Sequence, residues 1–139
     1  MDMLQTLVLY LHSWTRWLVL LVAVIAIVIF ALTWLRREAS SDFDRRLMGM
    51  YTGLFDLQTL LGVIILVWGL LGGVGLPRYR LEHAVTMVIA LVVVHLAMRW
   101  RNAPAARRAR NNLIAVVVSL ALVLAGISAL PVPWRFAGL

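Results

Sequence analysis

The sequence predicts an all-α integral membrane protein, a four-helix bundle that forms a single domain over residues 1–139. Three observations support this prediction. The chain of 139 residues is 63% hydrophobic and 14% charged, whereas ordinary soluble domains are about 45–50% apolar. Apolar runs long enough to span about 30 Å of hydrocarbon occur four times, with short connections between them. Runs such as LVLLVAVIAIVIFALTWL lack alternating polarity, which argues against a membrane β-barrel.

The first helix is expected from about residue 16 to residue 35, and two arginines follow it. The preceding segment LQTLVLYLHSW either extends this helix outward or lies along the membrane interface. Its apolar run is too long for the h-region of a signal peptide, and no basic segment precedes it. We therefore expect the first helix to be retained.

The second helix is expected from about residue 42 to residue 72. Ser41 and Asp44 have the spacing of a capping box, which predicts a start near Asp42 and a first part that extends into the cytoplasm. The segment GGVGLPRYR then breaks the helical pattern with glycines and a proline. The third helix is expected from about residue 82 to residue 98.

The fourth helix is expected from about residue 113 to residue 130, where the sequence is uniformly apolar. Pro131 and Pro133 follow this run and predict its end. No internal sequence repeat relates one half of the chain to the other.

The distribution of arginine predicts the orientation of the bundle. Four arginines (Arg16, Arg78, Arg80 and Arg135) are expected on one side of the membrane. The other nine lie in or beside the first and third connections, and they are Arg36, Arg37, Arg45, Arg46, Arg99, Arg101, Arg107, Arg108 and Arg110. Positively charged loops face the cytoplasm, so both termini are expected outside, in a multi-pass protein of the bacterial cytoplasmic (inner) membrane.

Aromatic residues are expected to form belts at the two membrane interfaces. The predicted inner belt contains Trp34, Tyr51 and Trp100. The predicted outer belt contains Trp14, Trp17, Trp68, Tyr79 and Trp134. These positions agree with the orientation that the arginines predict.

Composition excludes several classes of function. The absence of cysteine removes disulfides, thiolate metal sites, iron–sulfur clusters and covalent haem attachment. The net charge of +7 lies mostly in two connections, so anionic lipid headgroups are expected partners and nucleic acid is not. No phosphate-binding loop and no aqueous Ser/His/Asp set is recognisable.

A polar group is expected at the outer end of the bundle. His12 and Arg16 lie one helical turn apart, and Glu82 and His83 begin the third helix, which is parallel to the first. Two neutral imidazoles can bind haem iron axially, and an arginine can pair with a propionate. His12, Arg16 and His83 are therefore candidate ligands of haem b. The alternative is a hydrogen-bonded and ionic cluster that joins the helices without any cofactor.

The second helix carries a stripe of small residues that includes Gly62, Gly69 and Gly72, with Gln58 on the same face. A flat macrocycle can lie against such a stripe, which makes Gly62 and Gly69 candidate cofactor contacts. The alternative is close helix packing, for which membrane proteins use small residues.

Three further residues within the spans suggest metal or proton chemistry. Met87 lies one turn after His83 and is an alternative ligand for haem iron or copper. Asp56 and His95 are expected at similar depth near the inner end. Such a pair can relay protons or bind a quinone, or it is a satisfied polar contact near cytoplasmic water.

Several short motifs together resemble those of small bacterial four-helix membrane proteins that are loosely labelled cytochrome b-like. They are the segment with His12, Ser13, Arg16 and Trp17, the Asp56-Leu57-Gln58 step, the Glu82-His83 pair and the Pro-Trp ending. In this resemblance His12, Arg16, Gln58, His83 and Met87 occupy the polar positions of the family, and His95 is particular to this sequence. The family label implies b-type haem.

These observations leave two main hypotheses of function. The first is a small membrane subunit that binds b-type haem and transfers electrons to a quinone pool or a partner redox complex. The second is a cofactor-free accessory or assembly subunit of a larger respiratory or photosynthetic complex. Both make a subunit more plausible than a free-standing enzyme. Transport is the weakest alternative, because four helices enclose little volume.

Overall fold

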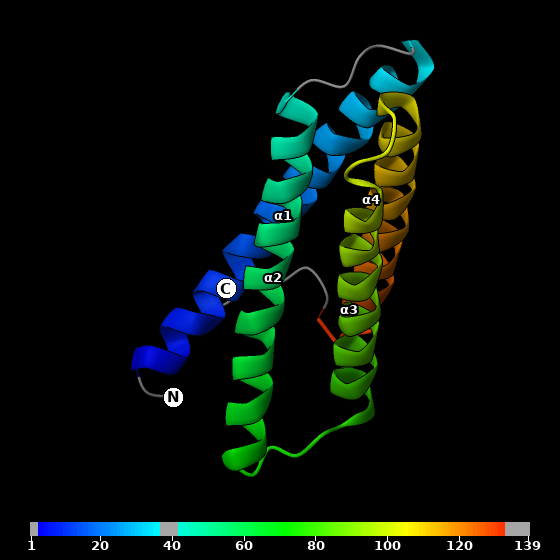
Figure 1. The fold of residues 1–139 in the computed structure, drawn as a ribbon. Helices are drawn as coiled ribbons and strands as arrows, with labels where there is room; N and C mark the ends of the chain where they lie inside the picture. Colours follow the sequence, from blue (N-terminus) through cyan, green and yellow to red (C-terminus); the bar gives the residue numbers. More distant parts are fainter. Residues whose placement is uncertain (1–2, 37–41, 133–139) are drawn as a thin grey trace.

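The computed structural model describes residues 3–36 and 42–132, and it is helical along most of this length (Figure 1). The helices are α1 (Met3–Arg36), α2 (Asp42–Leu71), α3 (Arg78–Leu96), the 3₁₀ helix η1 (Ala97–Trp100) and α4 (Ala105–Ser128). Four segments are long and apolar enough to cross a membrane: α1, α2, α3 continued by η1, and α4. The predicted all-α class, with four helices able to span a membrane, is therefore confirmed.

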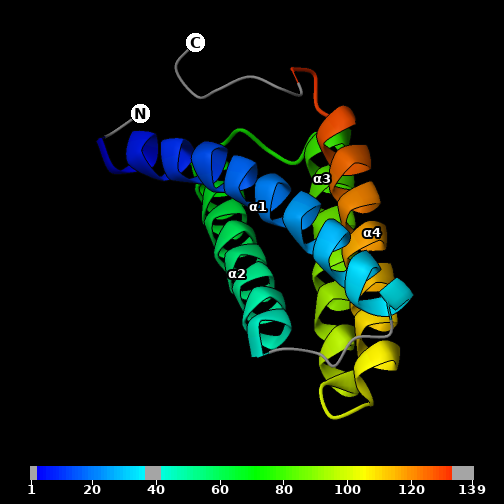
Figure 2. The same cartoon turned by 90° about the horizontal axis from the view of Figure 1, so that it is seen from above.

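The helices do not lie parallel to one another. α1 crosses the others obliquely, and Figure 2 shows its first part over α2 and its last part over α4. Its contacts are accordingly with α2 and α4, whereas α3 packs mainly against α4. α2 and α3 contact each other less. The α1–α4 pair thus forms the scaffold on which α2 and α3 are held.

Small and aromatic side chains make up the core of this scaffold. Ala23 and Ala26 on α1 are fully buried, and such small residues allow membrane helices to approach closely. Phe30 is also fully buried. On α2, the rings of Tyr51 and Phe55 pack edge to face with centroids 5.8 Å apart.

The burial of Tyr51 corrects one prediction. Tyr51 has no exposed surface, so it belongs to the core rather than to an aromatic belt. Its hydroxyl lies 2.9 Å from Ser119 Oγ on α4. Ser119 itself donates to the carbonyl oxygen of Val116 at 3.0 Å, so the Tyr51 hydroxyl donates to Ser119. A polar chain therefore links α2 to α4 inside the bundle.

Three helices begin earlier than their apolar runs predict. α1 continues back to Met3, so the segment before residue 16 extends the helix. α3 begins at Arg78, directly after Pro77, and α4 begins at Ala105, directly after Pro104. Hydropathy marks only the part of a helix that lies in hydrocarbon, whereas the backbone hydrogen bonds continue through polar residues beyond it.

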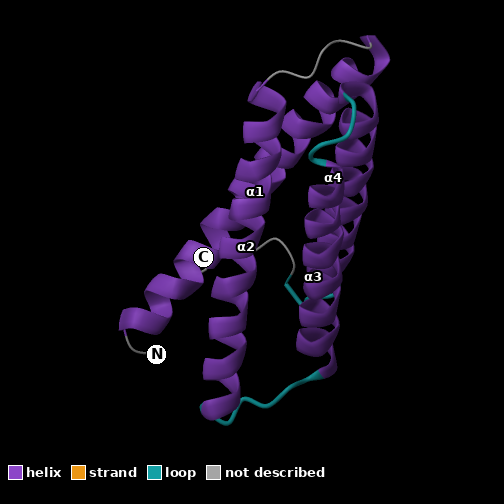
Figure 3. Cartoon of the chain, viewed as in Figure 1, coloured by secondary structure: helices purple, strands orange, loops and turns teal. Residues whose placement is uncertain are grey.

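The connections between helices are short (Figure 3). α2 begins at Asp42 as predicted, although the proposed cap Ser41 lies outside the described residues. α2 ends in a Schellman motif: Val74 N–H donates to Gly69 O at 2.9 Å, and Gly73 has φ +76°. At the other end of the chain, α4 stops at Ser128 before Pro131. Pro133, Trp134 and Arg135 lie outside the described residues.

One arginine of the third connection is structural. Arg108 is only 6% exposed, and its guanidinium donates to Ala103 O at 3.1 Å and to Arg101 O at 3.4 Å. These bonds satisfy backbone carbonyls of the segment between η1 and α4. Arg108 therefore faces the protein, not a lipid headgroup.

The Tyr51–Ser119 hydrogen bond yields a first prediction. Ser119→Ala should cost about 1–3 kcal/mol of unfolding free energy, because it leaves the buried Tyr51 hydroxyl without an acceptor. Tyr51→Phe should cost only about 1 kcal/mol, because Ser119 keeps its bond to the backbone. Titration with SDS in detergent micelles, followed by circular dichroism, measures both values.

The exposed Ser128→Ala variant at the end of α4 provides the control and should leave stability unchanged. A Tyr51→Phe cost equal to or greater than that of Ser119→Ala would contradict the assigned direction of the hydrogen bond.

Candidate functional site

The candidate site begins where α1 crosses α2. His12 on α1 lies against Gly62 on α2, and a Cβ added to Gly62 would be 3.1 Å from the ring carbon Cε1. The Nε2 atoms of Gln58 and His12 are 3.2 Å apart. In this orientation of the amide its nitrogen donates, and the ring nitrogen accepts the hydrogen bond. The missing side chain at Gly62 thus lets the imidazole reach the surface of α2.

Arg16 and His83 belong to the same cluster. Both interact electrostatically with His12, although α1 packs against α2 and α4 rather than against α3. The guanidinium carbon of Arg16 lies 5.6 Å from the centre of the Trp17 ring. Arg16 and His83 therefore lie in the neighbourhood of His12, and Gln58 is in direct contact with it.

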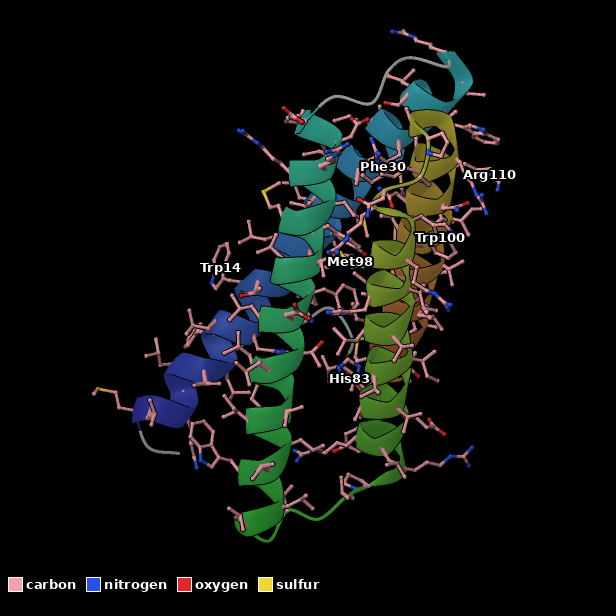
Figure 4. All side chains as sticks on the ribbon, viewed as in Figure 1. Trp14, Phe30, His83, Met98, Trp100 and Arg110 are labelled. Carbon is pink, nitrogen blue, oxygen red and sulfur yellow. The ribbon has the colours of Figure 1, made fainter. Side chains whose placement is uncertain are left out.

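His83 is oriented by a backbone carbonyl group of α4. Its Nδ1 atom lies 2.9 Å from Gly126 O, and a carbonyl oxygen only accepts, so Nδ1 carries a proton. In the neutral imidazole the lone pair is then on Nε2. In Figure 4, His83 lies on the side of α3 that faces the interior of the bundle.

Two atoms of the cluster have unmet hydrogen-bonding capacity. Among the described residues, His12 Nδ1 and Gln58 Oε1 are buried and have no hydrogen-bond partner. Buried polar atoms are nearly always paired, so two unpaired atoms in one cluster are unusual. The Gln58 amide has a second orientation, turned by 180°, in which Oε1 accepts from His12 Nε2–H. In that orientation, and not in the one described above, the Nδ1 lone pair is the unmet group of the ring.

The glycine stripe of α2 is covered by side chains of the neighbouring helices. His12 covers Gly62, and Arg80 of α3 covers Gly69, where an added Cβ would lie 2.6 Å from Arg80 Nη1. The stripe thus accommodates an imidazole and a guanidinium. It fits the packing alternative and is not a bare surface for a macrocycle.

Two other candidate residues make contacts with other partners. The methyl group of Met87 packs against Gly126 of α4, 2.6 Å from where a Cβ would be. Met87 therefore takes part in the α3–α4 contact. Glu82 pairs with Arg78, with Nε and Oε1 2.6 Å apart, at the exposed start of α3.

Asp56 and His95 form the second polar group. His95 Nε2 is 3.4 Å from Asp56 Oδ1, while His95 Nδ1 donates to Leu91 O at 3.0 Å. Because both facing atoms are acceptors when unprotonated, attraction between them requires one proton on the imidazole or on the carboxyl group. The side chains are 48% and 51% exposed, so this pair lies on the surface of α2 and α3.

The described residues restrict the kind of metal site that is possible. Within 3–36 and 42–132, no three His, Cys, Asp or Glu side chains group closely enough to hold a metal ion. A centre with two imidazole ligands from different helices does not need such a group. Comparison with protein-family models, curated proteins and solved structures gives no match. Function is therefore inferred from the geometry of the cluster.

Sequence reasoning missed Arg80 and Gly126 as site residues. Gly126 is a single glycine within an apolar helix, which is a signal for a close contact. Arg80 lies three residues before His83 and thus on the same face of α3, but nothing in its neighbourhood marks it as a partner of Gly69.

Two glycines of α2 allow a matched test of the His12 contact. Gly53→Ala should raise the free energy of unfolding by about 0.5–1 kcal/mol through helix propensity, because nothing lies within 4 Å of the new methyl group. Gly62→Ala should lose this gain, because its methyl group meets the His12 ring. Unfolding by SDS in the same detergent compares the two. An equal gain at both positions would show that His12 does not lie on Gly62.

Proposed function

We propose that this chain is a small membrane electron-transfer subunit that holds a b-type haem at the cluster of His12, Arg16 and His83. The observation that carries the proposal is the hydrogen bond from His83 Nδ1 to Gly126 O. Histidines that bind metals usually donate their second ring N–H to a carbonyl or carboxylate. This bond leaves the lone pair of the neutral ring on His83 Nε2, which is the atom that a metal would bind.

The residues of the cluster have the chemistry that a b-type haem requires. His83 Nε2 and the unmet Nδ1 of His12 would hold the iron, and Gln58 orients the His12 ring. Arg16 on α1 and Arg80 on α3 offer positive charge for the propionates. Gly62 and Gly69 contribute room for His12 and Arg80 rather than a surface for the macrocycle.

A b-type haem supplies one-electron transfer. The protein holds the two rings in place from α1 and α3, and α2 and α4 provide the amide and carbonyl that orient them. The resemblance to cytochrome b-like proteins adds support at the same polar positions. The electron partner that we propose is a quinone pool or a redox subunit, and Asp56 and His95 are candidates for a proton or quinone contact.

The absorbance spectrum tests this proposal. Protein expressed with added haem and purified in mild detergent should show a Soret band. His12→Ala and His83→Ala should each abolish or shift the band, because each removes one axial ligand. His95→Ala is the matched control, since it removes the third histidine of the chain and should leave the spectrum unchanged. A colourless protein, or unchanged spectra in both ligand variants, would refute haem binding.

A cofactor-free accessory subunit is the second candidate, and the exposure of α2 and α3 favours it. In the most apolar stretch of each helix, only 11% of the residues of α2 and 17% of those of α3 with η1 are buried. The corresponding shares are 33% for α1 and 39% for α4. The half-exposed Asp56–His95 pair is costly in hydrocarbon unless something covers it. A partner subunit on this face would do so. A colourless chain that co-purifies stoichiometrically with a larger complex would support this alternative.

We further propose that both termini lie outside and that the arginine-rich connections face the cytoplasm. The absence of cysteine makes single-cysteine labelling a direct test. Val74→Cys, in the α2–α3 connection, should react with a membrane-impermeant maleimide in intact cells. Asn102→Cys, before α4, should react only after permeabilisation. Both native residues are exposed, and the reverse pattern would overturn the orientation.

A further inference from the structure

A shallow cavity lies at the arginine-rich end, between the end of α1 and the start of α4. Its volume is about 360 Å³, and it is lined by Trp34, Ala106, Arg107 and Arg110. Figure 4 shows the side chain of Arg110 pointing away from the bundle. Of the described residues that line the cavity, two are arginines and none is acidic, so these side chains give it positive charge.

The two arginines of this cavity are available to a ligand. Arg107 and Arg110 are exposed and lie three residues apart, which places them on one face of α4. The Nε atom of Arg110 is 3.3 Å from Asn111 Oδ1, a neutral group that does not compensate the positive charge. Arg108, between them, points inward and holds backbone carbonyls.

The same face of α4 continues as an apolar surface. Beyond Arg110, exposed positions recur every three or four residues at Ile114, Val117, Ala121 and Leu124. Two guanidinium groups therefore stand at the end of an apolar stripe that lies within a predicted span. Trp34 lies beside them, and tryptophan favours the headgroup level of a membrane.

We infer that this cavity binds the phosphate headgroup of an anionic phospholipid whose acyl chains lie along the exposed face of α4. Guanidinium groups bind phosphate oxygens through paired, charge-assisted hydrogen bonds. A free phosphate shares that chemistry, but the apolar stripe below the arginines provides contacts only for a lipid. Lipid binding at this end does not depend on haem binding.

Lipid retention in a neutral detergent tests the site without the background of a charged membrane surface. Purified protein is mixed with phosphatidylglycerol or phosphatidylcholine, and native mass spectrometry counts the lipids that remain bound. We expect phosphatidylglycerol to be retained in preference to phosphatidylcholine. The Arg107→Gln/Arg110→Gln variant should bind phosphatidylglycerol about tenfold more weakly or worse, because each arginine near an anionic headgroup contributes a severalfold factor.

Arg45→Gln/Arg46→Gln is the matched control, because it removes two exposed charges from α2, outside the cavity. It should retain the lipid, and thermal unfolding should show that both double variants remain folded. Equal losses in the two double variants, or equal retention of both lipids, would overturn the site. Displacement of the lipid by millimolar inorganic phosphate would overturn the lipid as its ligand.

Discussion

Hydrocarbon offers no hydrogen-bond partners, so polar side chains in these helices must be satisfied by the protein itself or by a bound group. Most are satisfied locally: the hydroxyls of Thr15, Thr52 and Thr59 each donate to the carbonyl oxygen four residues earlier. Tyr51 reaches Ser119 across the bundle. Among the described residues, His12 Nδ1 and Gln58 Oε1 are buried side-chain atoms without a hydrogen-bond partner. At that cluster a bound group would satisfy the most unmet hydrogen-bonding capacity.

The oblique course of α1 explains how such a cluster arises. Because α1 contacts both α2 and α4, a side chain near its start reaches α2, whereas its later turns pack on α4. Each histidine of the cluster then meets a glycine of a neighbouring helix. Gly62 gives His12 room on α2, and Gly126 gives His83 a carbonyl acceptor on α4. The positions of the two imidazole rings are thus set by their close contacts with the backbone of α2 and α4 rather than by charged side chains.

The spans were predictable because an uninterrupted apolar run that matches the thickness of the hydrocarbon core is rare in soluble domains. The sequence placed His12 and His83 near the same end by assuming parallel helices, whereas α1 crosses the bundle obliquely. The partners were not predictable, because they depend on helix rotation and crossing. Arg108 sits among exposed arginines in sequence, yet it turns inward. Glu82, adjacent to His83, pairs instead with Arg78 on its own helix.

The glycine stripe of α2 is a second feature whose contacts could not be predicted from the sequence. Its spacing correctly indicated one face of α2 but could not indicate what covers that face. Both a macrocycle and a crossing helix favour small residues at this spacing. The structure decides between these two alternatives. The His12 side chain from α1 covers Gly62, and the Arg80 side chain from α3 covers Gly69.

The two polar groups are too far apart to act as one site. His83 and His95 are twelve residues apart on α3, which separates them by about 18 Å along the helix and by about 120° around it. The Asp56–His95 contact therefore lies well away from the cluster of His12 and His83. If the chain transfers electrons, its redox partner must approach the end that carries His12. In that case the half-exposed Asp56–His95 pair would serve a separate contact on the face of α2 and α3.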